Sequence, residues 1–320
     1  MAGGGGGTIT ERGLTAAFKR AKQSGVFIVQ NQNLAKYPME LCDFVNFTVE
    51  GENWWDGSEL VRIDMSLNKL ESIPEEVHQQ NTVQHFNLTG NLIKAIPDTL
   101  FKMEALKILD ISNNQISVLS DALGEAKALR ELQAKGNQIA RIPDSIVELQ
   151  ALELLDVSQN KLTALPSTIG SLPRLFKLNL DENQLTVIPA CFAGLQALTD
   201  LSMAKNKIAA VEEDALAPLS NLCMLELHQN CFSGYFSSVP KSEKLDRLSL
   251  AFNQLQGLEN VDRAPNLTLL DLHSNKIQTL PDSLCTMYKL QALKISNNDL
   301  SDINPRISLL DSLVRMNIEG

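Results

Sequence analysis

The chain has 320 residues, a formal charge of −10 at pH 7, and a composition that is 44% hydrophobic but only 5% aromatic. No apolar run approaches the roughly 18 residues that span a bilayer, so we expect no transmembrane helix. No basic and apolar leader follows Met1, so a secretory signal peptide is not expected either.

The first 59 residues precede the regular part of the sequence. Residues 1–10 carry a five-glycine run, and we expect them to be disordered. Apolar side chains then recur at helical spacing, at Leu14, Ala17, Phe18 and Ala21, with Lys19, Arg20 and Lys22 on the other side. This pattern predicts a short amphipathic helix that ends at Gly25. We interpret it as a cap on the end of the fold; a membrane-surface role is the alternative.

One sequence unit fills residues 60–320. Residues 152–166 read L-x-x-L-x-V-x-x-N-x-L-x-x-L-P, and the same frame starts at Leu60, Val83, Leu106, Leu129, Leu152, Leu175, Leu198, Leu222, Leu245, Leu267 and Leu290. The fourth and sixth positions alternate along a short strand, and one unit cannot bury its leucines alone. Stacked units therefore predict an α/β solenoid: a leucine-rich repeat arc with a parallel concave sheet and short helical or irregular convex segments.

The ninth position is asparagine in every complete unit. Its amide can both donate and accept, so we predict a structural ladder that bonds backbone groups of its own unit and the next. A proline often follows, at Pro74, Pro97, Pro143, Pro166, Pro189 and Pro281. Proline suits a return segment that starts one or two helical turns.

Two regions depart from the regular unit. Residues 25–38 are a degenerate copy with Phe27, Val29 and Leu34 at core positions, and an insertion with Trp54 and Trp55 follows, so we assign 11–59 to an N-terminal cap. We favour a cap role for the tryptophans over an exposed anchor for a partner. In the unit from Leu222, the aromatic residues Phe232, Tyr235 and Phe236 suggest a loop that contacts a partner. We prefer the alternative interpretation, in which Phe232 is a core residue and the other residues are variation in the loop.

The five cysteines are odd in number and scattered, and extracellular arrays of this class usually carry clustered disulfides, so we expect an intracellular, cytoplasmic protein. Cys223, His228 and Cys231 diverge on the predicted fold and make no metal site. No phosphate-binding, zinc-protease or serine-hydrolase motif occurs. We expect no enzyme activity, no cofactor and no metal.

The third, fifth and seventh positions are expected to face outward on the concave sheet. Acidic residues outnumber basic ones there, so nucleic acid is an unlikely partner. A column of acids and amides among isolated apolar residues has two interpretations: a solvated face, or a surface for a basic partner. The candidate protein-binding residues are Asp64, Asn87, Asp110, Gln133, Leu154, Asp156, Lys177, Asn179, Glu226, Arg247 and Asp271.

The sequence also resembles a known family. The units resemble intracellular Ras-group leucine-rich repeat proteins, and Ala21–Gly25, Asn33–Pro38 and Gly51–Trp55 resemble leucine-rich-repeat-containing protein 40 and its plant counterparts. That family continues beyond the point matching Gly320, so we expect the last repeat to be truncated or covered. The resemblance implies an intracellular, non-enzymatic scaffold near small GTPases, and it transfers no site residue.

Three functions remain open at this point. The first is a monomeric adaptor in signalling that binds another protein on the concave face. The second is a regulatory or targeting subunit of a protein phosphatase. The third is the recognition part of a larger enzyme whose catalytic region lies beyond residue 320.

Overall fold

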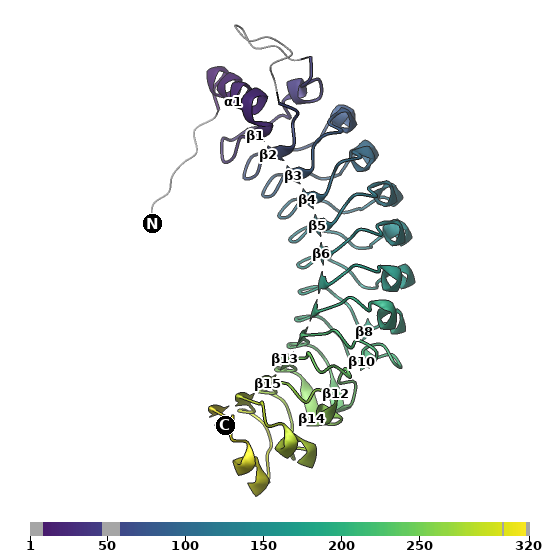
Figure 1. Cartoon of the computed structure of the whole chain (residues 1–320), viewed down its shortest axis with the longest axis vertical. Helices are drawn as coiled ribbons and strands as arrows, with labels where there is room; N and C mark the ends of the chain where they lie inside the picture. The colour runs from purple at the N-terminus through teal and green to yellow at the C-terminus, as the bar shows by residue number, and fades with distance from the viewer. Residues whose placement is uncertain (1–8, 47–57, 303, 318–320) are drawn as a thin grey trace. The chain divides into compact units, whose positions relative to one another are not determined.

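The computed structural model describes residues 9–46, 58–302 and 304–317. Two compact units divide the chain, residues 1–161 and 162–320. Figure 1 colours the chain by residue number and labels elements of both units. Trp54 and Trp55 lie outside the described residues, so the predicted role of this insertion stays a prediction. Within the part of the chain that the structure describes, no helix is both long and apolar enough for a membrane span.

The first unit begins with the helix α1 (Glu11–Ser24) and continues as short strands and 3-10 helices. Its six strands are parallel and follow chain order: β1 (Val26–Ile28), β2 (Arg62–Asp64), β3 (His85–Asn87), β4 (Ile108–Asp110), β5 (Glu131–Gln133) and β6 (Leu154–Asp156). Its 3-10 helices are η1 (Met39–Leu41), η2 (Glu75–Gln79), η3 (Asp98–Lys102), η4 (Asp121–Glu125) and η5 (Asp144–Glu148).

The second unit repeats this arrangement with a longer set of strands. Its main sheet is also parallel: β7 (Lys177–Asn179), β9 (Asp200–Ser202), β11 (Met224–Glu226), β13 (Arg247–Ser249), β15 (Leu269–Asp271), β16 (Ala292–Lys294) and β17 (Arg315–Asn317). Two side sheets pair β8 (Val187–Ile188) with β10 (Ala210–Val211), and β12 (Ser233–Phe236) with β14 (Gln254–Leu258). The 3-10 helices are η6 (Ser167–Ser171), η7 (Ala190–Gly194), η8 (Val261–Arg263), η9 (Asp282–Thr286) and η10 (Pro305–Leu309).

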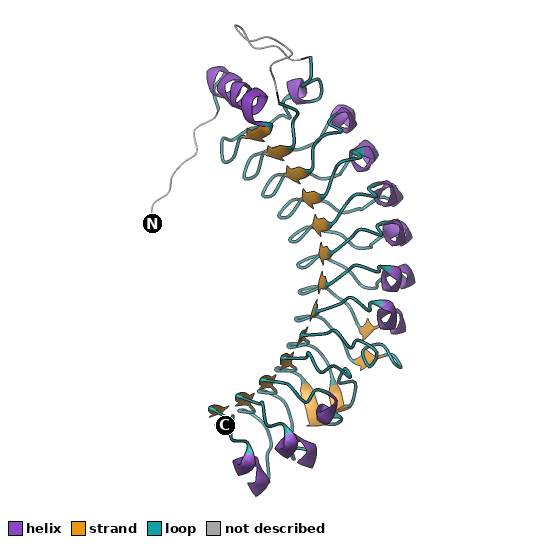
Figure 2. Ribbon diagram, viewed as in Figure 1, coloured by secondary structure: helices purple, strands orange, loops and turns teal. Residues whose placement is uncertain are grey.

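The core lies between the main sheet and the 3-10 helices of each unit (Figure 2). Fourth-position residues pair in register across neighbouring strands, as in Phe86 with Leu109 and Leu248 with Leu270, and all four are at most 1% exposed. Each such side chain contributes roughly 2 kcal/mol by burial. The predicted leucine-rich repeat fold is confirmed.

The asparagine ladder has a direction that the sequence did not reveal. Asn114 accepts the N–H of Ile93 at 3.1 Å and donates to the carbonyl of Leu88 at 3.0 Å, both in the preceding unit. It also donates to the carbonyl of Ile111 in its own unit. The ladder therefore joins each unit to the one before it, and the predicted bond to the next unit is wrong.

The residue before each ladder asparagine has a left-handed backbone. All eleven have φ between +53° and +70°: Leu67, Gly90, Asn113, Gly136, Gln159, Glu182, Lys205, Gln229, Phe252, Ser274 and Asn297. This conformation turns the chain so that the following asparagine points into the core. It costs a non-glycine residue roughly 1 to 2 kcal/mol, and bulky Leu67 and Phe252 are the unexpected occupants.

Prolines begin the helical turns as predicted. Pro74, Pro97, Pro143, Pro166, Pro189 and Pro281 each precede a five-residue 3-10 helix. Ser120 precedes a similar helix, η4, so proline favours this turn without being required. In the unit from Leu222, Phe232 and Phe236 are both buried and pack edge to face at 5.4 Å, whereas Tyr235 is exposed.

The N-terminal helix packs on the first strand. Phe18 of α1 contacts Phe27 of β1 with ring centroids 5.0 Å apart, and Phe27, Val29 and Leu34 are buried as predicted for a degenerate repeat. Lys22 is the exception to the amphipathic pattern, because it is only 8% exposed. Its placement on the polar side of the helix is therefore wrong.

Candidate functional site

The fifth-position residues form one row on the open face of the first unit, the face opposite the 3-10 helices. Register places Asp64, Asn87, Asp110, Gln133 and Asp156 side by side on β2 to β6. Leu154 lies beside this row on β6 and is half-buried. The structure therefore brings the six candidate residues of this unit onto one face of the sheet.

Much of this row has a structural role that neither interpretation of the sequence included. Asp110 Oδ1 accepts the backbone N–H of Ser112 at 2.9 Å, and Asn87 Oδ1 does the same for Thr89. Asn179 and Asp271 repeat this bond in the second unit. A short side chain with an oxygen on Cγ can bond the N–H two residues ahead, so both aspartate and asparagine satisfy the requirement. The shared Asp or Asn identity of the column was the available signal.

Asp64 differs from the other members of the row because it is buried. Its side chain accepts from Gln30 Nε2 at 2.6 Å, from Asn87 Nδ2 at 3.3 Å and from the N–H of Ser66 at 3.1 Å. The residue is 1% exposed, because β1 and Gln30 cover it. Asp64 is therefore inaccessible to a partner in this structure, contrary to its placement on an open surface.

The seventh position is also less open than expected. Small residues there are buried, namely Ser66, Ser112, Ser158, Ala204 and Ala251. The seventh residue begins the turn to the ladder asparagine, so its side chain lies close to the backbone. Among the larger residues at this position, Lys135 is exposed and His228 is half-buried. The expectation that all seventh-position side chains face outward is wrong.

The open face of the second unit contains a hollow. Lys177 and Arg247 are exposed, whereas Asn179 and Glu226 are half-buried and Asp271 is buried at 7% exposure. A hollow of about 320 Å3 lies over β11, β13, β15 and β16. Three of the candidate residues line it: Glu226, Arg247 and Asp271.

Two carboxylate–imidazole pairs stand on this hollow. His228 Nδ1 lies 3.2 Å from Glu226 Oε2, and His273 Nδ1 lies 2.5 Å from Asp271 Oδ1. Lys294 Nζ bonds the other oxygen of Asp271 at 3.0 Å. The hydrogen bond that the His228 imidazole donates to the Glu226 carboxylate raises the pKa of His228, and burial acts in the opposite direction. His228 therefore holds its proton more readily than an ordinary histidine.

Catalytic and metal chemistry have no support among the described residues. No group of three or more histidine, cysteine, aspartate or glutamate side chains in the described ranges is placed to hold a metal ion. Cys231 is exposed after the turn, while Cys223 is half-buried before its strand. Burial raises the pKa of Cys42 to about 11 and also raises the pKa values of Cys191 and Cys285. These thiols stay protonated at neutral pH and are poor nucleophiles.

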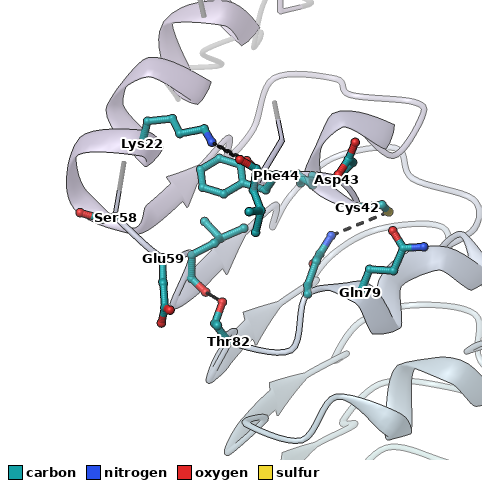
Figure 3. Close-up of a pocket in the computed structure, with 12 residues that line it drawn as sticks. Lys22, Cys42, Asp43, Phe44, Ser58, Glu59, Gln79 and Thr82 are labelled. Atoms are coloured by element: carbon teal, nitrogen blue, oxygen red, sulfur yellow. Dashed lines mark hydrogen bonds between the residues drawn. The ribbon is translucent and has the colours of Figure 1, made fainter. Parts of the chain in front are cut away.

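A second cavity, of about 290 Å3, lies beside α1 (Figure 3). Lys22 reaches from the helix to donate to the carbonyl oxygens of Phe44 and Val45, and its ammonium lies 4.6 Å from the centre of the Phe44 ring. Gln80 bonds the buried hydroxyl of Tyr37 at 2.7 Å. These polar groups bond one another across the cap, which favours a structural role for the cavity.

Comparisons with known proteins agree with this geometry. A model described as a leucine-rich repeat region matches residues 118–264, and one described as leucine rich repeat matches 81–139, 243–300 and 265–320. Osteomodulin of Bos taurus is 34% identical over 118 residues, which make up 35% of this chain and 27% of osteomodulin. This chain thus spans only about a quarter of that relative.

Solved structures share the fold at low identity. The internalin InlF of Listeria monocytogenes has a TM-score of 0.75 and 16% identity, with 96% of this chain and 95% of that chain covered. The plant peptide hormone receptor RGFR1, in complex with RGF2, has a TM-score of 0.61 and 23% identity, with 98% and 61% covered. The repeat models together with the ladder and the parallel sheets show that the chain belongs to the leucine-rich repeat family.

Proposed function

We propose that this chain is a non-enzymatic scaffold that binds another protein through the open face of its sheets. Leucine-rich repeat proteins generally mediate protein–protein interactions. The supporting observation is the third-position row of that face, where Ile108, Leu154, Met224 and Leu269 lie half-buried among charged groups. Partly exposed apolar side chains within a polar surround are typical of a protein interface.

The same proposal includes an intracellular, cytoplasmic setting and an adaptor role in signalling. All five cysteines are unpaired, as is usual for proteins in a reducing compartment. The resemblance to the protein 40 group of intracellular Ras-group repeats adds a small GTPase pathway as the setting for the partner. A monomeric state belongs to this proposal as well. RGFR1 in complex with RGF2 provides a precedent for ligand binding by this fold.

Affinity capture followed by mass spectrometry tests the binding face. In the first unit, the double variant Asp110→Asn and Asp156→Asn removes two charges, yet each amide oxygen can still accept the N–H of residue 112 or 158. In the second unit, Arg247→Gln and Lys294→Gln remove two exposed charges. The matched control, Glu104→Gln with Glu125→Gln, removes two exposed charges away from the open face.

We expect partners captured by wild type to be lost from at least one open-face variant and kept by the control. Circular dichroism and urea unfolding establish that each variant is folded. Partners that survive both open-face variants but disappear with the control would place binding on the other side of the molecule and contradict the proposal.

A further inference from the structure

The hollow on the second unit owes its depth to two small residues. Ser249 and Ala251 on and after β13 are 7% and 1% exposed, and they form its floor. On one side stand Glu226 and His228, and on the other Asp271 and His273. A small-residue unit between two large-residue units leaves space for a side chain of another molecule.

The charges around this floor favour an anionic ligand. Glu226 already bonds His228, and Asp271 bonds both His273 and Lys294. Arg247 extends from β13 with a side chain that is 60% exposed, and its Nε bonds Asp246, which is not among the residues that line the hollow. The carboxylates of the hollow are largely covered, because the side chains of Glu226 and Asp271 are 23% and 9% exposed, whereas those of Arg247 and Lys294 are 60% and 49% exposed at its rim.

Phe252 supplies an apolar group beside these charges. It lies on the rim with φ +54° and is 48% exposed, and its ring meets His273 edge to face at 4.6 Å. Every unit has this left-handed turn before its ladder asparagine, so the backbone itself does not mark a site, but a phenylalanine is a bulky residue to occupy it. Neither burial nor the turn itself explains a phenylalanine here.

We propose that this hollow binds an acidic peptide segment of a partner protein, with a carboxylate between Arg247 and Lys294 and an adjacent apolar side chain against Phe252. The proposal rests on the proposed function and names its ligand. Charge complementarity carries the choice of an acidic over a basic segment. Arg247 extends from the floor strand β13 and Lys294 from β16, two strands away, and a guanidinium and an ammonium at one rim can both donate to one carboxylate.

The same geometry makes binding depend on pH. His228 faces Glu226, with Asp181 and Lys205 nearby, and His273 faces Asp271, Lys294 and Phe252. With His228 neutral, the acids Glu226 and Asp271 balance the bases Arg247 and Lys294. Protonation of His228 adds one positive charge to the hollow, so an acidic peptide binds more tightly as pH falls from 7.5 to 5.5, whereas a basic peptide binds more weakly.

A random dodecapeptide phage-display library provides the probe. Selection on the folded chain at pH 6 is expected to enrich peptides in which aspartate or glutamate adjoins an apolar residue. Selected peptides are then synthesised with fluorescein, and their dissociation constants are measured by anisotropy. Replacing the peptide carboxylate with its amide is expected to weaken binding about tenfold.

Protein variants place the peptide on the hollow. Arg247→Gln, alone and with Lys294→Gln, is expected to weaken binding about tenfold. If the double variant is less stable than wild type, the single variant is used for the comparison.

Phe252→Gly is expected to weaken binding yet raise the urea midpoint, because glycine accepts the left-handed backbone without strain. Leu67→Gly is the matched control: Leu67 has φ +58° and is 59% exposed, but lies on the first unit. It should raise the midpoint and leave affinity unchanged.

The proposal is overturned if selection yields no peptides, if the selected peptides are basic, or if acidic peptides keep their affinity in the Arg247→Gln variant. Tighter binding at higher pH would overturn it as well. Its failure is distinguishable from failure of the proposed function. If a captured partner is lost with the Asp110 and Asp156 variant but not with the hollow variants, the proposed binding on the open face still holds. Only the proposal about the hollow is then contradicted.

Discussion

The Oδ1 atom of Asp110 accepts the backbone N–H of Ser112 at 2.9 Å, within the strand-to-turn segment of one repeat. Asp156 makes the same bond to the N–H of Ser158, at 2.9 Å. The acids of this column therefore stabilise the turn that precedes each ladder asparagine. Their negative charge remains available to a partner. Replacing these acids with alanine therefore changes both the stability of the turn and the charge of the open face.

Asp110→Ala is expected to lower the free energy of unfolding by about 1 kcal/mol, because the N–H of Ser112 loses its acceptor. Asp110→Asn should be nearly neutral, because Asn87 makes the corresponding bond with an amide oxygen. Urea unfolding of both variants measures the difference. Equal destabilisation by the two substitutions would show that the charge, rather than the hydrogen bond, stabilises the turn.

The parts of the structure that the sequence predicted are those set by periodicity. Leu155 and Val157 identify a strand face, and Pro166 identifies the start of η6, because each property depends only on neighbouring residues and a constant period. Burial that arises from distant segments was not predictable in this way. Asp64 is covered by Gln30 from a degenerate repeat, and the hollow depends on Ser249 and Ala251 being smaller than their neighbours in adjacent units.

Asn160→Ala should lower the free energy of unfolding more than Asp110→Ala does. The Asn160 side chain accepts the N–H of Ile139 and donates to the carbonyls of Ala134, Val157 and Ser158. Its loss leaves buried backbone groups unpaired in two successive repeats, so we expect destabilisation of roughly 1 to 3 kcal/mol or more. Lys161→Ala, at the exposed next position, is the control and should change stability by less than about 0.5 kcal/mol.

Binding distinguishes a structural role for Asn160 from a direct one. Under conditions where the variant is folded, partner capture or peptide affinity should match wild type, since the amide is 8% exposed and points into the core. Loss of binding at unchanged stability would refute the structural assignment.

The Glu226–His228 pair predicts a pH-dependent contribution to stability. Because the His228 pKa is raised in the folded state, the folded chain binds this proton more tightly than the unfolded chain. The stabilisation is fully present below the ordinary pKa of 6.5 and is lost as pH rises through the raised value. Glu226→Gln removes the main cause, so the His228 pKa should fall, and the stability advantage of wild type over this variant should shrink at alkaline pH.

Histidine NMR titration measures that pKa directly, and urea unfolding at pH 5.5 and 8.5 measures the stability. Glu125→Gln is the control, because it removes a distant exposed acid and should leave the His228 titration unchanged. An identical His228 titration in wild type and Glu226→Gln would show that the carboxylate does not hold the proton.

Lys22→Met tests the buried attachment between α1 and the residues that follow the degenerate repeat. The ammonium of Lys22 donates to the carbonyls of Phe44 and Val45 and lies over the Phe44 ring, so methionine keeps the aliphatic packing but leaves those carbonyls without this donor. We expect a loss of roughly 1 to 3 kcal/mol and faster amide hydrogen exchange in α1. Lys19→Met, exposed on the same helix, should leave both quantities unchanged. If the two variants behave alike, Lys22 contributes through its stem alone, and the hydrogen bonds do not hold the helix in place.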